Sequence, residues 1–226
     1  MRVYLTGIGR SGTTYLKQIL SYLSSKGEIN FPHHMHHSKL SNINPDDIIF
    51  TPCRDLRDVM VSRWRILLSE ESKYNEVEER IMTKEEIDRE LKPTSTLNSQ
   101  LIDIVYNINK YDEVVKLINY HQFLNNPKYI LDCISFYTGK IIDSSLYLKE
   151  LEKFSLEKNK ERANKLNNFK DWDGDGIHGH HCYKGEVGGW KKYIPKEYHD
   201  YVYTTLKSLL IQNPKLKNKW KKFIQE

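Results

Sequence analysis

The sequence predicts an α/β protein of three layers, in which helices cover both faces of a central, mostly parallel β-sheet. Two observations lead to this prediction. Short apolar runs typical of buried strands alternate along the chain with longer segments whose apolar residues recur every three or four positions. The N-terminus joins a strand directly to a helix through a loop that contains glycines. Alternating strands and helices indicate a parallel sheet, because each helix returns the chain to the same edge.

The first strand covers residues 3–5, which are apolar and β-prone, and apolar residues recur at helical spacing from Thr13 onward. Residues 28–35 form a second extended segment. Residues 47–51 predict a short buried strand, after which another helix begins near Asp55.

The middle of the chain, residues 66–110, predicts a mainly helical insertion that is broken at Pro93. A further strand is expected over residues 113–120. Pro127 then opens another helix, and the glycine-rich residues 174–189 predict a loop. We expect this insertion to lie on the side of the protein that binds a substrate.

Composition and length favour one globular domain over residues 1–226. The chain has 226 residues, 38% of them hydrophobic and 29% charged, with no repeat and no linker rich in Pro, Gly or Ser. No secretory signal and no apolar run of about eighteen residues are visible. The cysteines Cys53, Cys133 and Cys182 lack the spacing of a zinc site or a disulfide framework. We expect a cytoplasmic protein with reduced thiols.

The net charge of +5 is modest, and lysines gather near the C-terminus at positions 215, 217, 219, 221 and 222. They predict a solvated final helix, so neither a nucleic acid nor a membrane is expected as a partner.

The N-terminal loop carries the pattern Gly7-x-x-x-x-Gly12-Thr13-Thr14. This glycine spacing is typical of loops whose backbone N–H groups cradle phosphate at the start of a helix. The lysine that follows the second glycine in nucleotide-triphosphate loops is replaced by Thr13, and the cation Arg10 lies inside the loop. An anion with less charge, such as a phosphosulfate, suits this loop better than a magnesium-bound triphosphate. The alternative is a tight turn with a threonine cap and no ligand.

Residues 10–15, Arg-Ser-Gly-Thr-Thr-Tyr, resemble the 5′-phosphosulfate loop of the sulfotransferases, whose usual cytosolic form is Lys-Ser-Gly-Thr-Thr-Trp. The resemblance implies the donor 3′-phosphoadenosine-5′-phosphosulfate (PAPS), the product PAP, and a P-loop-like fold. The implied contacts with the donor are Arg10, Ser11, Gly12, Thr13, Thr14 and Tyr15.

A second segment resembles the family's 3′-phosphate motif. Arg54 stands at the end of a predicted strand and Ser62 lies eight residues later on a predicted helix. A guanidinium and a hydroxyl so placed can clasp one phosphate. The alternative is that Arg54 only pairs with a neighbouring Asp.

A third segment, Tyr120 with Asn126-Pro127, resembles the strand end where the family contacts adenine. The family's acidic pair is His121-Gln122 here, so a buried core tyrosine is the alternative for Tyr120.

A fourth segment, residues 183–191, is similar to the loop that closes over the nucleotide in the family. Lys184, Gly185, Gly188 and Trp190 match the pattern. The family's first Arg is Tyr183 here and its Asp is Gly189, so Lys184 must compensate for one lost guanidinium. Tyr15, Tyr120 or Trp190 could stack on adenine.

The general base is expected among the histidines at positions 33, 34, 36 and 37, where the family places a Lys-x-His pair. Histidine titrates near neutral pH, as a base for a hydroxyl or amine acceptor requires. We prefer His36, then His37 and His34. An exposed or metal-binding tract is the alternative.

A further acidic run, Asp171-x-Asp173-x-Asp175-Gly176, copies half of a calcium loop but has Cys182 where the twelfth ligand would be. Because this acidic run stands directly before the covering loop, we interpret residues 171–191 together as a lid and nucleotide-covering loop.

The resemblance as a whole implies in-line sulfonate transfer from PAPS to a small-molecule or glycan acceptor, with no metal required. Arg10 and the loop amides would stabilise charge on the leaving phosphate. The alternatives are a P-loop kinase, which would need ATP and magnesium, and a nucleotide-binding module without turnover. The acceptor and the oligomeric state are not legible in the sequence.

Overall fold

The structure is a computed structural model that describes residues 1–32, 39–70, 80–124, 126–167, 171–179, 186–216 and 219–224. Three strands form its sheet: β1 (Val3–Leu5), β2 (Ile48–Cys53) and β3 (Val115–Asn119). They run parallel in the order β1-β2-β3. The carboxyl ends of all three strands therefore lie at one edge of the sheet.

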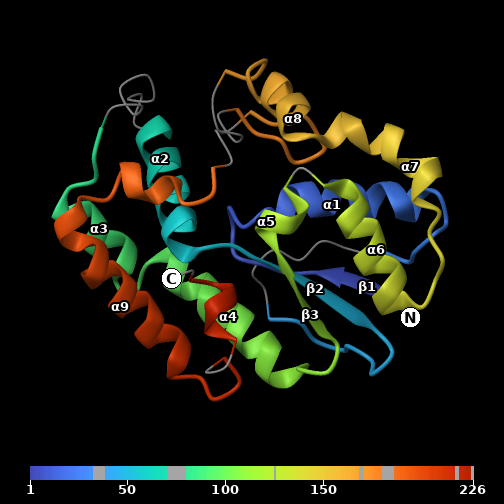
Figure 1. The fold of residues 1–226 in the computed structure, drawn as a ribbon, viewed down its shortest axis with the longest axis horizontal. Helices are drawn as coiled ribbons and strands as arrows, with labels where there is room; N and C mark the ends of the chain where they lie inside the picture. The colour runs from blue at the N-terminus through green and yellow to red at the C-terminus, as the bar shows by residue number, and fades with distance from the viewer. Residues whose placement is uncertain are drawn as a thin grey trace.

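Helices connect and cover these strands (Figure 1). They are α1 (Thr13–Ser25), α2 (Leu56–Glu70), α3 (Lys84–Leu91), α4 (Thr96–Lys110), α5 (Tyr120–Phe123), α6 (Pro127–Thr138), α7 (Ser144–Leu151), α8 (Leu156–Ala163) and α9 (His199–Ile211). Short 3-10 turns occur at Glu152–Phe154, Gly189–Lys192, Lys196–Tyr198 and Trp220–Lys222.

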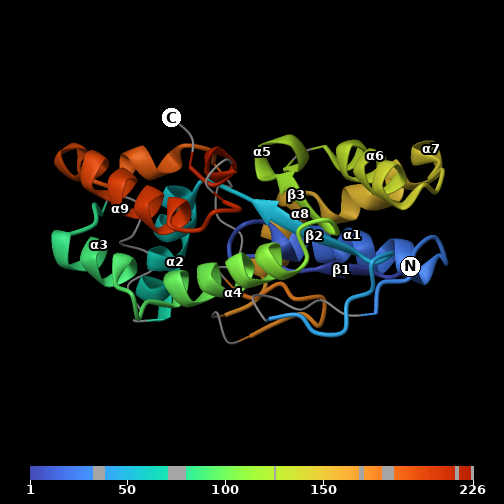
Figure 2. The ribbon, with the colours of Figure 1, turned by 90° about the horizontal axis from the view of Figure 1, so that it is seen from below.

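Successive strand residues point to opposite faces of the sheet, and each face has its own core. Ile48 and Phe50 pack with α1 and α6, whereas Ile49 and Cys53 pack with α2, α4 and α9. In Figure 1, α1, α6 and α7 gather beside the sheet on the right, and α2, α3 and α9 lie on the left; Figure 2 shows the same division from below. The α/β fold with a parallel sheet and a P-loop-like strand, loop and helix is confirmed.

The central strand β2 extends two residues beyond the predicted segment 47–51, through Pro52 to Cys53. Proline lacks the N–H that a central strand normally donates, which is why the sequence pattern stops before it. In the helical middle of the chain, α3 ends at Leu91 before Pro93. Ser95 then caps α4 by accepting from the Asn98 N–H at 3.2 Å.

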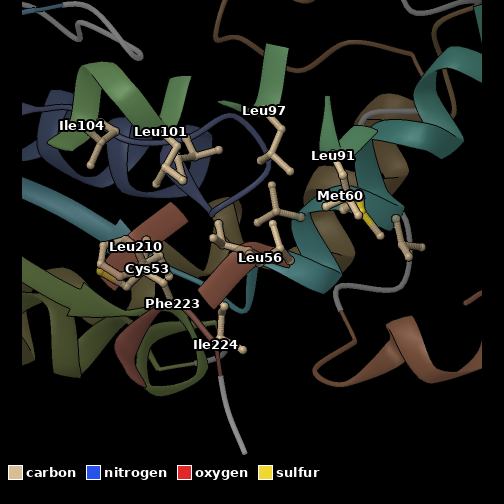
Figure 3. Packing of buried hydrophobic residues seen from close by; sticks show 14 of the residues in the cluster. Cys53, Leu56, Met60, Leu91, Leu97, Leu101, Ile104, Leu210, Phe223 and Ile224 are labelled. Atoms are coloured by element: carbon tan, nitrogen blue, oxygen red, sulfur yellow. The ribbon is translucent and has the colours of Figure 1, made fainter. Parts of the chain in front are cut away.

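Two expectations fail in part. The first part of the extended segment 28–35 is not a strand, although Asn30 O accepts from the Val3 N–H at 2.8 Å; its end lies outside the described residues. The predicted final helix is not formed in the described residues, although Lys215, Lys221 and Lys222 are exposed to solvent as expected. Beyond α9 the described chain has only the 3-10 turn Trp220–Lys222, and Phe223 and Ile224 are buried in the core (Figure 3).

In the parts of the chain that the structure describes, no helix is both long and apolar enough to cross a membrane.

Candidate active site

The loop between β1 and α1 lies at the carboxyl edge of the sheet, and its backbone is unusual at two points. Arg10 and Gly12 have φ angles of 74° and 95°, in the left-handed region. Glycine tolerates this conformation, but an arginine adopts it only where its surroundings hold it. Ser11 stabilises the turn, because its Oγ donates to Ile8 O at 2.6 Å.

The glycines of this loop allow close contacts with the rest of the fold. A Cβ on Gly7 would lie 2.7 Å from Thr13 Cγ2, and one on Gly12 would lie 2.7 Å from Tyr120 Cδ2 and 2.8 Å from Phe123 Cζ. Real Cβ atoms do not approach other atoms this closely. The glycine spacing therefore reflects packing of the loop against α1 and α5 as well as its conformation.

The first turn of α1 favours an anion. Its N-cap residue is Gly12, which has no side chain to cap the helix, and the first turn holds no acidic residue. The threonine cap of the alternative interpretation is therefore wrong, and the binding of a ligand here stays a prediction. The uncapped N–H groups and the partial positive charge of the helix end attract negative groups.

Arg10, Arg54 and Ser62 meet at this loop, as the resemblance implies. Arg10 Nε donates to Ser62 Oγ at 3.1 Å, and Arg54 Nη1 donates to Arg10 O at 3.0 Å. Arg54 Nη2 donates to Glu186 O at 3.0 Å. The residues of the first, second and fourth motifs thus form one hydrogen-bonded group, although they are far apart in the sequence.

Arg54 is only partly satisfied by these contacts. Its Nε is buried and has no hydrogen-bond partner among the described residues. Its guanidinium also lies over the Tyr120 ring, with Cζ 4.6 Å from the ring centroid. A buried guanidinium N–H without an acceptor is costly, so this environment favours an added anion.

Tyr15 and Tyr120 flank Phe123 beneath the loop. The Tyr15 and Phe123 rings are stacked with centroids 6.1 Å apart, and Tyr120 meets Phe123 edge-on at 5.4 Å. Burial raises the pKa of Tyr15 to about 12, so its hydroxyl stays protonated. Tyr120 is 5% exposed. The structure thus places Tyr120 in the core, and contact with adenine by either ring stays a prediction.

Asp58 holds the segment of the fourth motif that the structure describes, a role that sequence reasoning missed. Its carboxylate accepts from the Gly188 N–H at 2.8 Å and the Trp190 N–H at 3.0 Å. It thereby caps the 3-10 turn Gly189–Lys192 from the neighbouring helix α2. Burial raises the pKa of Asp58, while the charge of Arg54 and the two hydrogen bonds act against that rise.

The Trp190 ring is enclosed by other side chains. Arg57 Cζ lies 4.0 Å from the ring centroid, and the His199 ring meets Trp190 edge-on at 4.6 Å. Arg57 is itself held by Asp55, with Nη2 2.6 Å from Oδ2. This geometry favours Trp190 as an anchor of the covering loop over Trp190 as a stacking partner for adenine.

Next to Tyr120, His121 stands where the family has an acidic residue. Burial lowers its pKa, and the neighbouring carboxylates of Asp58 and Asp55 act in the opposite direction. The electrostatic balance therefore favours the neutral imidazole over the cation near neutral pH.

Several predicted site residues lie outside the described residues. These are the base candidates His34, His36 and His37 and the loop residues Lys184 and Gly185. Their roles stay predictions.

Leu40, which follows the histidine segment, is held by α4 and by the residue at its end. Leu40 N–H donates to Asn107 Oδ1 at 2.8 Å, and Tyr111 OH donates to Leu40 O at 3.1 Å.

The acidic run before the covering loop makes internal contacts. Arg162 on α8 pairs with Asp173 at 2.5 Å and Asp175 at 2.8 Å. Asp173 Oδ1 also accepts from the Ile177 N–H at 3.1 Å. A Cβ on Gly176 would lie 3.9 Å from Thr14 Cγ2, so this segment lies beside the start of α1. Within the described ranges, no three His, Cys, Asp or Glu residues are grouped closely enough to hold a metal ion.

Solved structures share this fold at low sequence identity. Mouse sulfotransferase SULT7A1 complexed with PAP matches with a TM-score of 0.61 and 14% identity, covering 96% of this chain and 88% of that chain. Retinol dehydratase in complex with androsterone and the inactive cofactor PAP matches with a TM-score of 0.58 and 17% identity, covering 93% and 81%. No curated protein matches the sequence significantly.

The family comparison is more specific than the fold. Residues 30–214 match the model of the sulfotransferase domain. The matched range begins after the N-terminal loop, whose assignment rests on its motif and on its contacts with Arg54 and Ser62. Because the match covers most of the sequence, this chain belongs to the sulfotransferase family.

Proposed function

We propose that this enzyme transfers a sulfonate group from PAPS to a hydroxyl or amine of a small polar acceptor by in-line displacement. One observation carries the proposal. The Arg54 guanidinium donates a hydrogen bond to Arg10 O in the N-terminal loop and another to Glu186 O in the fourth motif. The motifs that the family uses for the two ends of its donor therefore meet at one guanidinium.

The described residues fit a nucleotide with a phosphate at each end. The uncapped N-terminus of α1 and Arg10 supply donors for a 5′-phosphosulfate. Arg54 and Ser62 supply a cation and a hydroxyl for a 3′-phosphate, and the orphaned Arg54 Nε supports an anion at that point. The two similar structures were both solved with PAP.

When bound, PAPS supplies a sulfonate attached to a good leaving group. Arg10 and the loop N–H groups stabilise the negative charge that develops on the leaving phosphate oxygen. Arg54, Ser62 and Lys184 hold the 3′-phosphate, and Gly185 and Trp190 belong to the loop that covers the nucleotide. The phosphosulfate is bound by Ser11, Gly12, Thr13 and Thr14. Tyr15 and Tyr120 contact the adenine ring of the donor.

His36 takes the proton of the acceptor as the new bond to sulfur forms, with His37 and then His34 as the next candidates. A histidine base suits a hydroxyl or amine near neutral pH. The anchoring of Leu40 on Asn107 supports this role, because it fixes the chain just after the histidines to a helix that also contacts the loop through Gln100.

The acceptor pocket is assigned to α3 and α4. Residues 66–110, which contain these helices, are charged and poor in aromatic residues, a composition that favours a polar small molecule or glycan. The similar retinol dehydratase structure holds androsterone, which supports a small-molecule acceptor. The single domain over residues 1–226 and the cytoplasmic location stay predictions.

The function is tested by calorimetric titration with PAP, and with ATP in the presence and absence of magnesium. We expect PAP to bind without a metal and ATP to bind far more weakly. Preference for ATP with magnesium would favour a kinase and overturn the proposal. Labelled PAPS with a panel of hydroxyl and amine acceptors then separates an enzyme from a binding module. In that assay His36→Ala should lose turnover while it keeps its affinity for PAP.

A further inference from the structure

We infer that Gln100, on the acceptor-side helix α4, is a positioning residue that holds the phosphosulfate loop in its binding conformation. This inference rests on the proposed function. Its basis is a long-range contact: the Gly9 N–H donates to Gln100 Oε1 at 2.9 Å. Gln100 is 5% exposed and Gly9 is half-buried, so the bond is partly shielded from water.

The contact is built for close approach. A Cβ on Gly9 would lie 3.3 Å from Gln100 Oε1 and 3.6 Å from its Nε2, so the amide group lies directly against the glycine. Any other residue at position 9 would press on the amide. The glycine thus serves this contact, since it is not among the residues with positive φ.

Gln100 acts beside the strained residue of the loop. Arg10 adopts a φ of 74°, which a non-glycine residue keeps only if its neighbours fix it. Arg54 holds the carbonyl of Arg10 on one side, and Gln100 holds the N–H of Gly9 on the other. The two side chains, from the connection between β2 and α2 and from α4, hold the backbone on both sides of Arg10.

A second polar residue on the same face of α4 extends this support. Asn107 lies seven residues, about two helical turns, after Gln100. Its Nδ2 donates to Thr6 Oγ1 at 3.5 Å, and its Oδ1 accepts from the Leu40 N–H at 2.8 Å. Helix α4 therefore contacts the end of β1, the loop and the segment after the proposed base. We conclude that α4 fixes the loop relative to that segment, and that Gln100 is its link to the loop.

The test uses two ligands that differ only at the 5′ end, PAP and adenosine 3′-phosphate. Because Gln100 acts on the loop for the 5′ group, Gln100→Leu should weaken PAP binding about tenfold, the loss of one part-buried hydrogen bond. The affinity for adenosine 3′-phosphate should not change. A purely structural role would weaken both ligands equally, and such a result would overturn the inference. So would equal affinity of Gln100→Leu and wild type for PAP.

Two further variants guard against misfolding and general effects. Gly9→Ala leaves α4 intact and displaces the amide from the loop side, so it should show the same selective loss of PAP affinity. Gln212→Leu makes the same chemical change at an exposed position after α9 and should bind both ligands as wild type does. If wild type itself fails to bind PAP, the proposed function fails. If wild type binds PAP and both variants at the contact bind it equally well, only the role of Gln100 fails.

Discussion

Asp58 shows at the residue scale how a buried charge can serve binding at the expense of stability. Its carboxylate caps the backbone of the covering loop, yet burial raises its pKa above the ordinary value even though Arg54 lies nearby. A raised pKa means that Asp58 binds its proton more tightly in the folded state than in the unfolded state. The contribution of Asp58 to the free energy of unfolding is therefore fully present below its unfolded pKa and is lost as the pH rises through the folded pKa.

We expect Asp58→Asn to weaken PAP binding about fivefold, because the amide oxygen can replace only one of two charge-assisted acceptors. The same variant should be at least as stable as wild type near pH 7, because the cost of burying the ion is gone. Calorimetry and urea unfolding measure the two effects. A parallel loss of stability and affinity would contradict this interpretation.

The residues found from sequence and those missed differ in how their contacts arise. Arg10, Arg54 and Ser62 belong to short motifs whose spacing implies a phosphate ligand, and the structure brings them together. Asp58 and Gln100 act through partners 130 and 91 residues away. A single sequence carries no pattern that joins such positions, because the contacts exist only once the sheet has brought α2 and α4 to the loop.

At the scale of elements, α2 and α3 are joined by an ion pair with little access to water. Arg63 Nε lies 3.3 Å from Glu90 Oε2, with the two side chains 15% and 4% exposed. Burial raises the pKa of Glu90, while the charge and hydrogen bond of Arg63 lower it. The helices themselves were predicted from periodicity and Pro93, but this pairing was not.

We expect Arg63→Ala to lower the free energy of unfolding by roughly 3 kcal/mol near pH 7, because it leaves a buried carboxylate unpaired. Without Arg63 the folded pKa of Glu90 rises further, so the deficit grows as the pH rises and shrinks as Glu90 becomes protonated in acid. Urea unfolding at several pH values measures this. Lys128→Ala, which removes the exposed pair with Asp132 on α6, should change stability little. A deficit that does not depend on pH would contradict the role of Glu90.

At the scale of the whole molecule, the C-terminal segment packs behind the 3′-phosphate motif. Leu56 N–H, at the start of α2, donates to Phe223 O at 2.7 Å. Phe223 and Cys53 are each 1% exposed in the same core cluster (Figure 3). Arg54 lies between Cys53 and Leu56 in the sequence. The C-terminal segment thus supports the chain on both sides of Arg54. The lysine-rich composition of this segment gave no indication of that packing.

We expect Phe223→Ala to lower the free energy of unfolding by about 3 to 5 kcal/mol, the usual cost of removing a buried aromatic side chain from a packed core. Because the cavity adjoins the flanks of Arg54, PAP affinity should also fall in the fraction of protein that remains folded. Phe136→Ala provides the matched control, since Phe136 is 79% exposed on α6 and its loss should cost little. Urea unfolding of both variants, followed by PAP titration, measures these effects. Equal stability of the two variants would show that the C-terminal segment does not support the core. Unchanged PAP affinity in Phe223→Ala would show that this segment does not support the donor site.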